Sequence, residues 1–335
     1  MKHHNLLISL LSLYLTACTS IVPPQKPPLG EPLLRATYFQ TADGVVLPVR
    51  RWLPATEPKA ILIALHGFND YSRFFDQPGQ YFSAQGIVCF AYDQRGFGLS
   101  PQRGVWAGVP TYGDDLRSFV KQIKHRYPQQ PLYLLGESMG GAVIISALAK
   151  TDMPEVAGVV LSAPALWARS TMAWYQTAAL WTLTQTWPQL RLTGRGLHIK
   201  ASDNINMLRA LGRDPLVIKA TRVDAISGLS DLMDTAYANA NQLSADTLVL
   251  YGEKDQIIPK PPTYQFLQTF LATNNHTKTA AFYRNGYHML LRDLQAPLVW
   301  RDIAAWLDNK QQNLPSAADS QAQAVLENFN RSQSE

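Results

Sequence analysis

The sequence predicts an α/β fold in which a mostly parallel, doubly wound sheet carries an inserted helical cap. Short, largely apolar runs such as residues 59–65 and 87–92 are typical of strands buried on both faces of a parallel sheet. These runs alternate with helical segments, which is the pattern of such a sheet. The alternation stops after residue 164 and resumes at residue 246. We therefore expect roughly residues 165–240 to form a cap within one domain.

The elements are expected in a simple order. The domain begins with a β-hairpin over residues 34–40 and 45–53, with Asp43-Gly44 at the turn. The sheet and its helices then follow as strand 59–65, helix 72–85, strand 87–92, helix 112–127, strand 131–135, helix 142–149 and strand 156–161. After the cap come strand 246–251, helix 262–272, strand 279–283 and helix 297–307. The domain is therefore predicted to span residues 34–309.

The N-terminal residues are predicted to lie outside this domain. A short positive start precedes an apolar run over residues 6–15, which has the proportions of a signal peptide and is too short to span a bilayer comfortably. Leu15-Thr16-Ala17-Cys18 resembles the lipobox of bacterial lipoproteins. This resemblance implies that residues 1–17 are removed and that Cys18 carries acyl chains such as palmitate, with residues 18–33 as a proline-rich tether. An ordinary signal peptide or an uncleaved anchor are the alternatives.

The lipobox also indicates a location. The expected protein is lipid-anchored in the bacterial cell envelope, and Thr19 lacks the aspartate associated with inner-membrane retention, which favours the outer membrane facing the periplasm. The net charge of +5 comes without a long basic run, so no nucleic-acid partner is expected. Cys89 lies in an apolar run and is expected to be inert core. Residues 310–335 are polar and predicted to be disordered, with a weak helix over 322–329 as the alternative.

The candidate nucleophile is Ser138. It lies in Gly136-Glu137-Ser138-Met139-Gly140, between a predicted strand and a predicted helix, which is the context of a G-x-S-x-G nucleophile elbow. The serine must sit on a strained turn that exposes its hydroxyl, and glycines two positions to either side let strand and helix pass closely. The free N–H groups at the start of the helix are suited to a developing oxyanion.

A serine hydroxyl needs a base that is itself oriented by an acid. In a doubly wound sheet such groups follow the carboxyl ends of strands. Asp255 and His288 follow two strands after the cap, and the order Ser138, Asp255, His288 is that of triads built on this elbow. Glu253 remains an alternative acid. Asp246 precedes its strand and would lie at the wrong end of the sheet.

The oxyanion is expected to be held by two backbone N–H groups, those of Met139 and Phe68. Other histidines fit the role of base less well. His66 ends a strand before the serine and is expected to orient the adjacent loop, His276 precedes its strand, and His125 lies on a charged helix.

Together these motifs resemble the α/β-hydrolase superfamily, most closely its monoacylglycerol lipases and bacterial lysophospholipase-like hydrolases. The resemblance covers about residues 35–308 and rests on His66-Gly67-Phe68, residues 92–100, Gly136-Glu137-Ser138-Met139-Gly140-Gly141, Gly252-Glu253-Lys254-Asp255 and Gly286-Tyr287-His288. It implies a Ser138/Asp255/His288 triad, Phe68 and Met139 as oxyanion donors, a cap that shapes an acyl pocket, and no metal or cofactor. Asn69-Asp70-Tyr71 departs from the Gly-Glu-His often found in relatives, so their polar-head contacts do not transfer, while Asp93 is expected to fix its own loop.

The expected activity is that of a serine carboxylic-ester hydrolase that works through an acyl-enzyme. Monoacylglycerols or lysophospholipids are the leading substrates, because both the anchor and the apolar cap point to lipids. Acyl transfer, cleavage of small peptide amides, and lipid binding without catalysis are the alternatives, and the oligomeric state is left open. Trp167, Trp174 and Trp181 recur every seven residues, which predicts one helical face that either packs on the domain or forms an acyl channel or membrane-docking surface.

Overall fold

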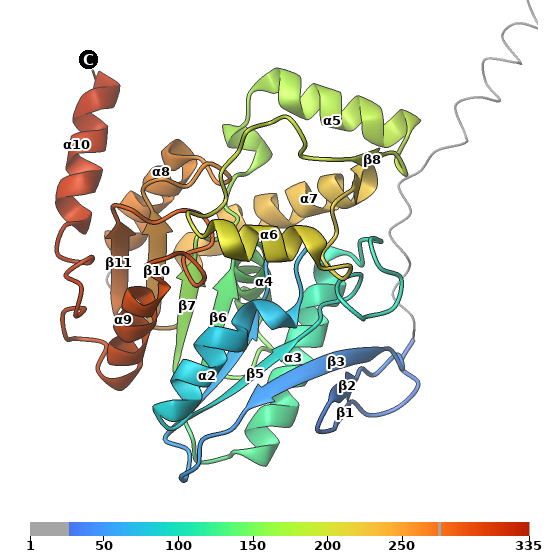
Figure 1. The fold of residues 1–335 in the computed structure, drawn as a ribbon, viewed down its shortest axis with the longest axis vertical. Helices are drawn as coiled ribbons and strands as arrows, with labels where there is room; N and C mark the ends of the chain where they lie inside the picture. Colours follow the sequence, from blue (N-terminus) through green and yellow to red (C-terminus); the bar gives the residue numbers. More distant parts are fainter. Residues whose placement is uncertain (1–26, 274–275, 335) are drawn as a thin grey trace, which may run out of the picture.

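The computed structural model describes residues 27–273 and 276–334. Within them a nine-stranded sheet has the order β1-β2-β3-β5-β4-β6-β7-β10-β11. β1 to β3 pair antiparallel at one edge, and β5 to β11 run parallel. Helices cover both faces of this sheet (Figure 1). The predicted α/β-hydrolase fold is confirmed.

Apolar strands explain why both faces are covered. Every residue of β4 (Ala60–Leu65), β5 (Ile87–Tyr92), β6 (Leu132–Glu137), β7 (Gly158–Ser162) and β10 (Thr247–Gly252) is buried. Alternate side chains of β4 enter opposite cores, because successive residues of a strand point to opposite faces. The remaining strands of the sheet are β1 (Leu33–Leu34), β2 (Tyr38–Gln40), β3 (Val46–Trp52) and β11 (Lys278–Tyr283).

The helices divide between the two cores. One core holds α3 (Val109–Arg126), α4 (Met139–Leu148) and α8 (Lys260–Leu271). The other holds α2 (Asp76–Ala84), the preceding 3-10 turn η1 (Ser72–Phe75) and α9 (Ala296–Asp308). Each helix therefore lies within a few residues of its predicted position.

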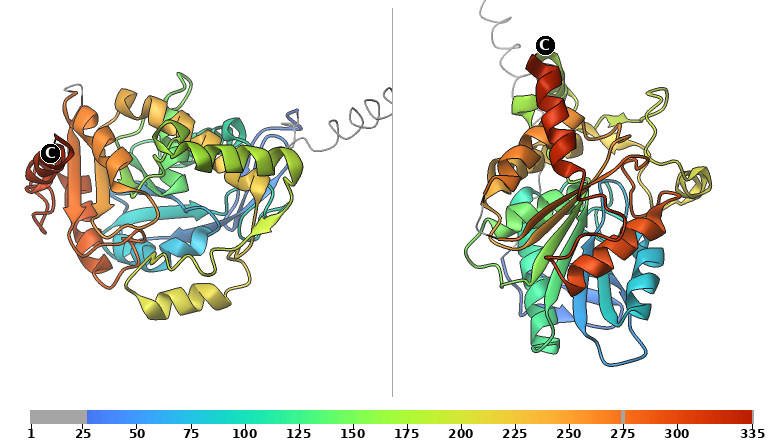
Figure 2. Two further views of the ribbon diagram at one scale, coloured as in Figure 1. Left: turned by 90° about the horizontal axis from the view of Figure 1, so that it is seen from above. Right: turned by 90° about the vertical axis from the view of Figure 1, so that its left-hand side faces the viewer.

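The cap is the segment between β7 and β10. It contains η2 (Arg169–Thr171), α5 (Trp174–Thr186), α6 (Ile205–Arg213), α7 (Val223–Asn239) and η3 (Ala240–Gln242). Two short strands that the sequence pattern did not indicate, β8 (Arg191–Leu192) and β9 (Thr221–Arg222), pair within it. Figures 1 and 2 show α5, α6 and α7 beyond the carboxyl ends of the parallel strands, where α7 packs on α4.

The predicted tryptophan face is wrong in one respect. Trp167 precedes η2 and lies outside any helix, because α5 begins only at Trp174. The side chains of Trp174 and Trp181 are 80% and 67% exposed, so they do not pack the cap onto the sheet. Of the thirteen residues of α5, only Thr184 is buried, although the helix carries apolar residues around its whole circumference.

Of the two predictions for the C-terminal tail, the helix over residues 322–329 agrees with the structure, whereas disorder does not for residues up to 334. This segment forms α10 (Ala322–Ser334), which Figures 1 and 2 show outside β11 at the edge of the sheet. Leu326 is buried in the core beside α8, and the ring of Phe329 lies 5.1 Å from that of Tyr264. These few apolar side chains recur at helical spacing, which the polar average composition hides.

The N-terminal predictions concern residues that lie outside the described part of the chain. The signal peptide over residues 1–17, the lipid attachment at Cys18 and most of the tether belong to this group. Between residues 27 and 334, apart from 274–275, no helix combines the length and the apolar character that a bilayer crossing requires. Cys89 is a buried free thiol.

Candidate active site

Ser138 occupies a strained turn between β6 and α4. Its backbone has φ 52° and ψ −113°, a region in which a residue other than glycine costs about 1–3 kcal/mol. The neighbouring glycines allow this turn. A Cβ on Gly136 would lie 2.4 Å from the Gly141 nitrogen, and a Cβ on Gly140 would lie 2.3 Å from the Leu65 oxygen. The predicted reason for both glycines, close passage of strand and helix, is therefore confirmed.

His288 and Asp255 meet at the carboxyl ends of β10 and β11. The His288 Nδ1 lies 2.8 Å from Asp255 Oδ2, and both side chains are almost fully buried. The other carboxylate oxygen, Oδ1, accepts backbone N–H groups from Ile257 and Ile258 at 2.7 and 3.0 Å, which fixes the carboxylate in its loop. This geometry suits a carboxylate that orients an imidazole.

The rival acids lie differently. The backbone N–H of Glu253 donates to the Tyr283 carbonyl, and no contact of its side chain with His288 is found among the described residues. Asp246 lies before β10 and pairs with Lys310 at 2.9 Å. Asp255 is thus the acid of the three that contacts the histidine.

The loop that carries the other proposed oxyanion donor passes close to the nucleophile. A Cβ on Gly67 would lie 3.4 Å from the Ser138 Cβ, and the next residue is Phe68. Met139 is the first residue of α4, where N–H groups have no partner within the helix. The two backbone N–H groups therefore come from two segments next to Ser138, while their function as oxyanion donors stays a prediction.

His66 fixes the base of this loop. It is fully buried, and its Nε2 accepts the backbone N–H of Gln94 at 3.0 Å. Its Nδ1 therefore carries the proton and donates to the Gly67 carbonyl at 2.8 Å. Burial lowers the pKa of His66, which favours this neutral form. The expectation that His66 orients the loop is confirmed, and Asp93 fixes its own loop by accepting the N–H of Leu99 at 2.8 Å.

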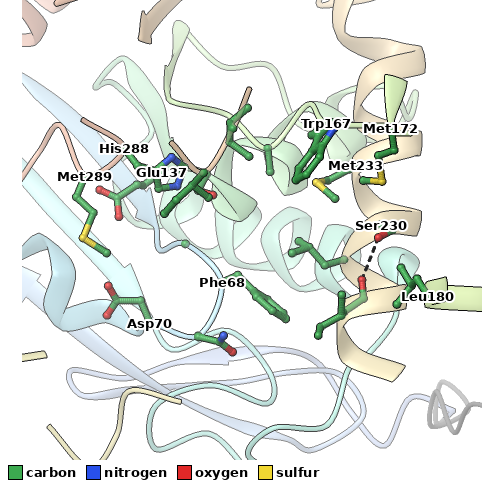
Figure 3. A pocket seen from close by; sticks show the side chains of 18 of the residues that line it. Phe68, Asp70, Glu137, Trp167, Met172, Leu180, Ser230, Met233, His288 and Met289 are labelled. Atoms are coloured by element: carbon green, nitrogen blue, oxygen red, sulfur yellow. Dashed lines mark hydrogen bonds between the residues drawn. The ribbon is translucent and has the colours of Figure 1, made fainter. Parts of the chain in front are cut away.

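A cavity of about 500 Å³ opens from Ser138 and His288 toward the cap (Figure 3). Its walls are mostly apolar and come from the cap and from the loop after β10: Trp167, Met172, Leu180, Leu229, Met233 and Ile257. Trp167 thus lines the cavity, whereas Trp174 and Trp181 do not. An apolar cavity that starts at the nucleophile is suited to an acyl chain.

Three charged residues at the polar end of this cavity were not predicted as site residues. They are Asp70, Glu137 and Arg292, and all three are buried. Glu137 was visible only as the variable position of the elbow motif. Arg292 lies in a segment with no motif, so nothing in the sequence indicated that it folds back against the elbow.

The charges around His288 predict the pH dependence of catalysis. Burial alone lowers the pKa of His288, but the charge and hydrogen bond of Asp255, together with Glu137, outweigh it and raise the pKa above the ordinary value of 6.5. A general base must be neutral, so activity is lost as the pH falls through this raised value. We expect the acid limb of kcat/KM on a soluble ester to have its midpoint above pH 6.5. A midpoint at or below that value would contradict this account of the charges.

Comparisons with known proteins agree with this architecture. Residues 56–295 match the model of a hydrolase family described as serine aminopeptidase, S33. The chain is 26% identical to the monoacylglycerol lipase of Mycolicibacterium smegmatis, covering 80% of this chain and 95% of the relative. It is 27% identical to the monoglyceride lipase of Rattus norvegicus, covering 86% and 95%.

Solved structures show the same fold. A soluble variant of the monoglyceride lipase from Saccharomyces cerevisiae, in complex with a substrate analog, aligns with a TM-score of 0.69 at 22% identity, covering 86% of this chain and 99% of that one. The monoacylglycerol lipase of Paleococcus ferrophilus aligns with a TM-score of 0.65 at 24% identity, covering 78% and 98%.

Proposed function

The chain belongs to the hydrolase family described as serine aminopeptidase, S33, and from this premise we propose that it is a serine ester hydrolase that cleaves monoacylglycerols. The observation that carries the proposal is the apolar cavity of about 500 Å³ that begins at Ser138 and His288. The relatives named as monoacylglycerol and monoglyceride lipases align over nearly their whole length, which supports the same substrate class here.

The proposed reaction is acyl transfer through the serine. His288 takes the Ser138 proton at Nε2 while Asp255 holds the proton on Nδ1, and the Ser138 oxygen attacks the ester carbonyl. The N–H groups of Phe68 and Met139 stabilise the tetrahedral oxyanion. His288 then gives its proton to the departing alcohol, and the acyl chain stays on Ser138. Water, activated by the same histidine, releases the fatty acid and restores the enzyme.

A side-by-side substrate panel tests this proposal. Release of fatty acid is measured from monoacylglycerols of several chain lengths, a lysophospholipid, short-chain model esters and an aminoacyl amide, with and without an added alcohol acceptor. We expect the monoacylglycerols to give the highest kcat/KM and to yield free fatty acid. Preference for the lysophospholipid or the amide, or transfer to the alcohol as the main product, would contradict the proposal in favour of the corresponding alternative.

The N-terminal pattern supports a lipid anchor at Cys18. An acylated Cys18 would hold the domain at a membrane by a proline-rich tether over residues 18–33, close to the lipids it is proposed to cleave. The envelope, and specifically the outer membrane facing the periplasm, is the proposed location because Thr19 follows the cysteine.

Replacing Cys18 with serine is expected to release the protein from the membrane, because a serine hydroxyl does not accept the lipid through a thioether. Full-length protein and Cys18→Ser are expressed in a bacterium, labelled with a fatty-acid analogue and fractionated. We expect label and membrane association in the first and neither in the second. Cys89→Ser is the matched control for the other cysteine and should keep both. Equal membrane association of full-length protein and Cys18→Ser would favour an uncleaved anchor.

A further inference from the structure

Three buried charges form one ionic cluster, defined here as Asp70, Glu137 and Arg292. Arg292 Nη1 lies 2.7 Å from Asp70 Oδ2, and Nη2 donates to Glu137 Oε1 at 2.7 Å. The exposed fractions of the three residues are 6%, 2% and 7%, so the pairs are shielded from water. The Arg292 guanidinium carbon also lies 5.8 Å from the centre of the Phe74 ring. The cluster carries two negative charges and one positive charge.

Each member of the cluster comes from a different segment of the proposed active site. Glu137 immediately precedes Ser138 on β6, Asp70 follows Phe68 by two residues, and Arg292 follows His288 by four. Figure 3 shows Glu137 beside His288, with Asp70 on the same side of the cavity. One guanidinium therefore ties together the segments of the nucleophile, the base and an oxyanion donor.

Stability alone is a weak reason for such a cluster. The cost of removing charges from water largely cancels the attraction between them, so a buried ion cluster contributes little beyond an apolar core of the same shape. This cluster is also incompletely bonded. Asp70 Oδ2 makes only the ion pair, and neither it nor Glu137 Oε2 nor Arg292 Nε has a hydrogen-bond partner among the described residues. Its arrangement is better explained by an effect on the neighbouring histidine and serine.

We infer that the ionic cluster is a positioning device for the reaction, an inference that rests on the proposed function. Arg292 fixes the relative positions of the three segments. The buried carboxylate of Glu137 stabilises the imidazolium that forms when His288 takes the Ser138 proton. None of the three residues needs to touch the substrate for this role.

The electrostatic part follows from the charges that surround the imidazole. Asp255 and Glu137 both favour the protonated form of His288, and Arg292 opposes it. Burial raises the pKa of Glu137, and the Arg292 guanidinium opposes that shift and so favours the ionised carboxylate. Among the described residues, His66 interacts with Asp70 and Arg292, and Asp293 interacts with Glu137.

Glu137→Gln tests the electrostatic part, because it removes one charge and keeps an oxygen for Arg292. The readout is the rate at which Ser138 reacts with a fluorophosphonate probe, which forms an oxygen–phosphorus bond and releases fluoride. We expect the acid limb of this rate to move to lower pH by up to about one pH unit, and the rate on the plateau to fall about tenfold. For a soluble ester, kcat is expected to fall while KM changes little.

Asp115→Asn is the matched control. Asp115 is a buried carboxylate that bonds Arg95, which also binds Asp43, so this second cluster likewise joins two carboxylates to one guanidinium but does not line the cavity. We expect Asp115→Asn to lower the melting temperature without moving the acid limb. Arg292→Lys tests whether Arg292 fixes the relative positions of the three segments, because one ammonium cannot bond two carboxylates in the manner of a planar guanidinium. Because lysine keeps the positive charge, this variant is expected to lower kcat while the pH midpoint of the acid limb stays at its wild-type value.

The outcomes separate this inference from the proposed function. If Glu137→Gln reacts with the probe at the wild-type rate and with the wild-type pH midpoint, the positioning role is wrong, whatever the natural substrate. If Glu137→Gln and Asp115→Asn shift the acid limb equally, the effect is a general consequence of lost stability and the inference fails. If the wild-type protein itself does not react with the probe, the proposed function fails.

Discussion

Replacing Ser138 with alanine is expected to lower the turnover of every ester by about 10⁶-fold, the loss typical of a triad without its nucleophile. The physical reason is that the whole proposed pathway passes through the Ser138 oxygen, which stands on a strained turn between two glycines that pack against backbone. Alanine keeps this turn but has no oxygen to attack the carbonyl. The measurement is kcat/KM on a short-chain ester together with labelling by a fluorophosphonate probe.

Ser146→Ala is the control for this experiment. Ser146 lies on helix α4, which begins directly after Ser138, and has the same exposed fraction as Ser138, 8%. It faces neither the cavity nor His288 in any contact found among the described residues. We expect Ser146→Ala to keep both turnover and labelling. If Ser138→Ala still hydrolysed esters at a rate near that of the wild type, another residue would be the nucleophile.

Replacing Asp255 with asparagine is expected to lower kcat by about 10⁴-fold. The Oδ1 atom of Asp255 accepts two backbone N–H groups, so the asparagine oxygen must take that position. The amide NH₂ group then faces His288 Nδ1 and donates to it. This forces the imidazole proton onto Nε2, which can no longer take the Ser138 proton. The measurement is kcat on a soluble ester at a pH where the wild type is fully active.

Glu253→Gln is the matched variant for the acid that the sequence left as an alternative. Glu253 lies two residues from Asp255 at the end of the same strand, and no contact of its side chain with His288 is found among the described residues. Its replacement is expected to change kcat less than about threefold, within the range of ordinary surface substitutions. A larger loss for Glu253→Gln than for Asp255→Asn would reverse the assignment.

The sheet and the elbow could be predicted from the sequence because each is encoded locally. A run such as β4, buried along its whole length, has no other place in a globular protein than the centre of a covered sheet. The elbow depends on residues 136–140, all within one turn of the chain. The Asp255–His288 pair could be predicted because each residue follows a strand. The carboxyl ends of parallel strands lie at the same edge of the sheet, so residues that follow neighbouring strands lie close together.

The features that were missed depend on contacts between distant segments. Glu137 and Arg292 are separated by 155 residues, and neither shows a pattern that indicates the other. The polar tail beyond residue 310 becomes ordered because a few of its side chains, such as Leu326, find apolar partners on α8 and β11. The prediction from the tryptophan spacing was wrong because the seven-residue repeat starts at Trp167, whereas α5 starts only at Trp174. One member of the repeat therefore lies outside the helix.

The exposure of α5 has a consequence for how a lipid reaches Ser138. α4 buries nine of its ten residues and holds the elbow, whereas α5 buries one of thirteen and forms a wall of the cavity through Leu180. Local unfolding costs little free energy where few side chains are buried. We therefore expect the wall that α5 contributes to open at a lower cost in free energy than the elbow beside α4. Entry of a long acyl chain past α5 would then leave the catalytic geometry undisturbed.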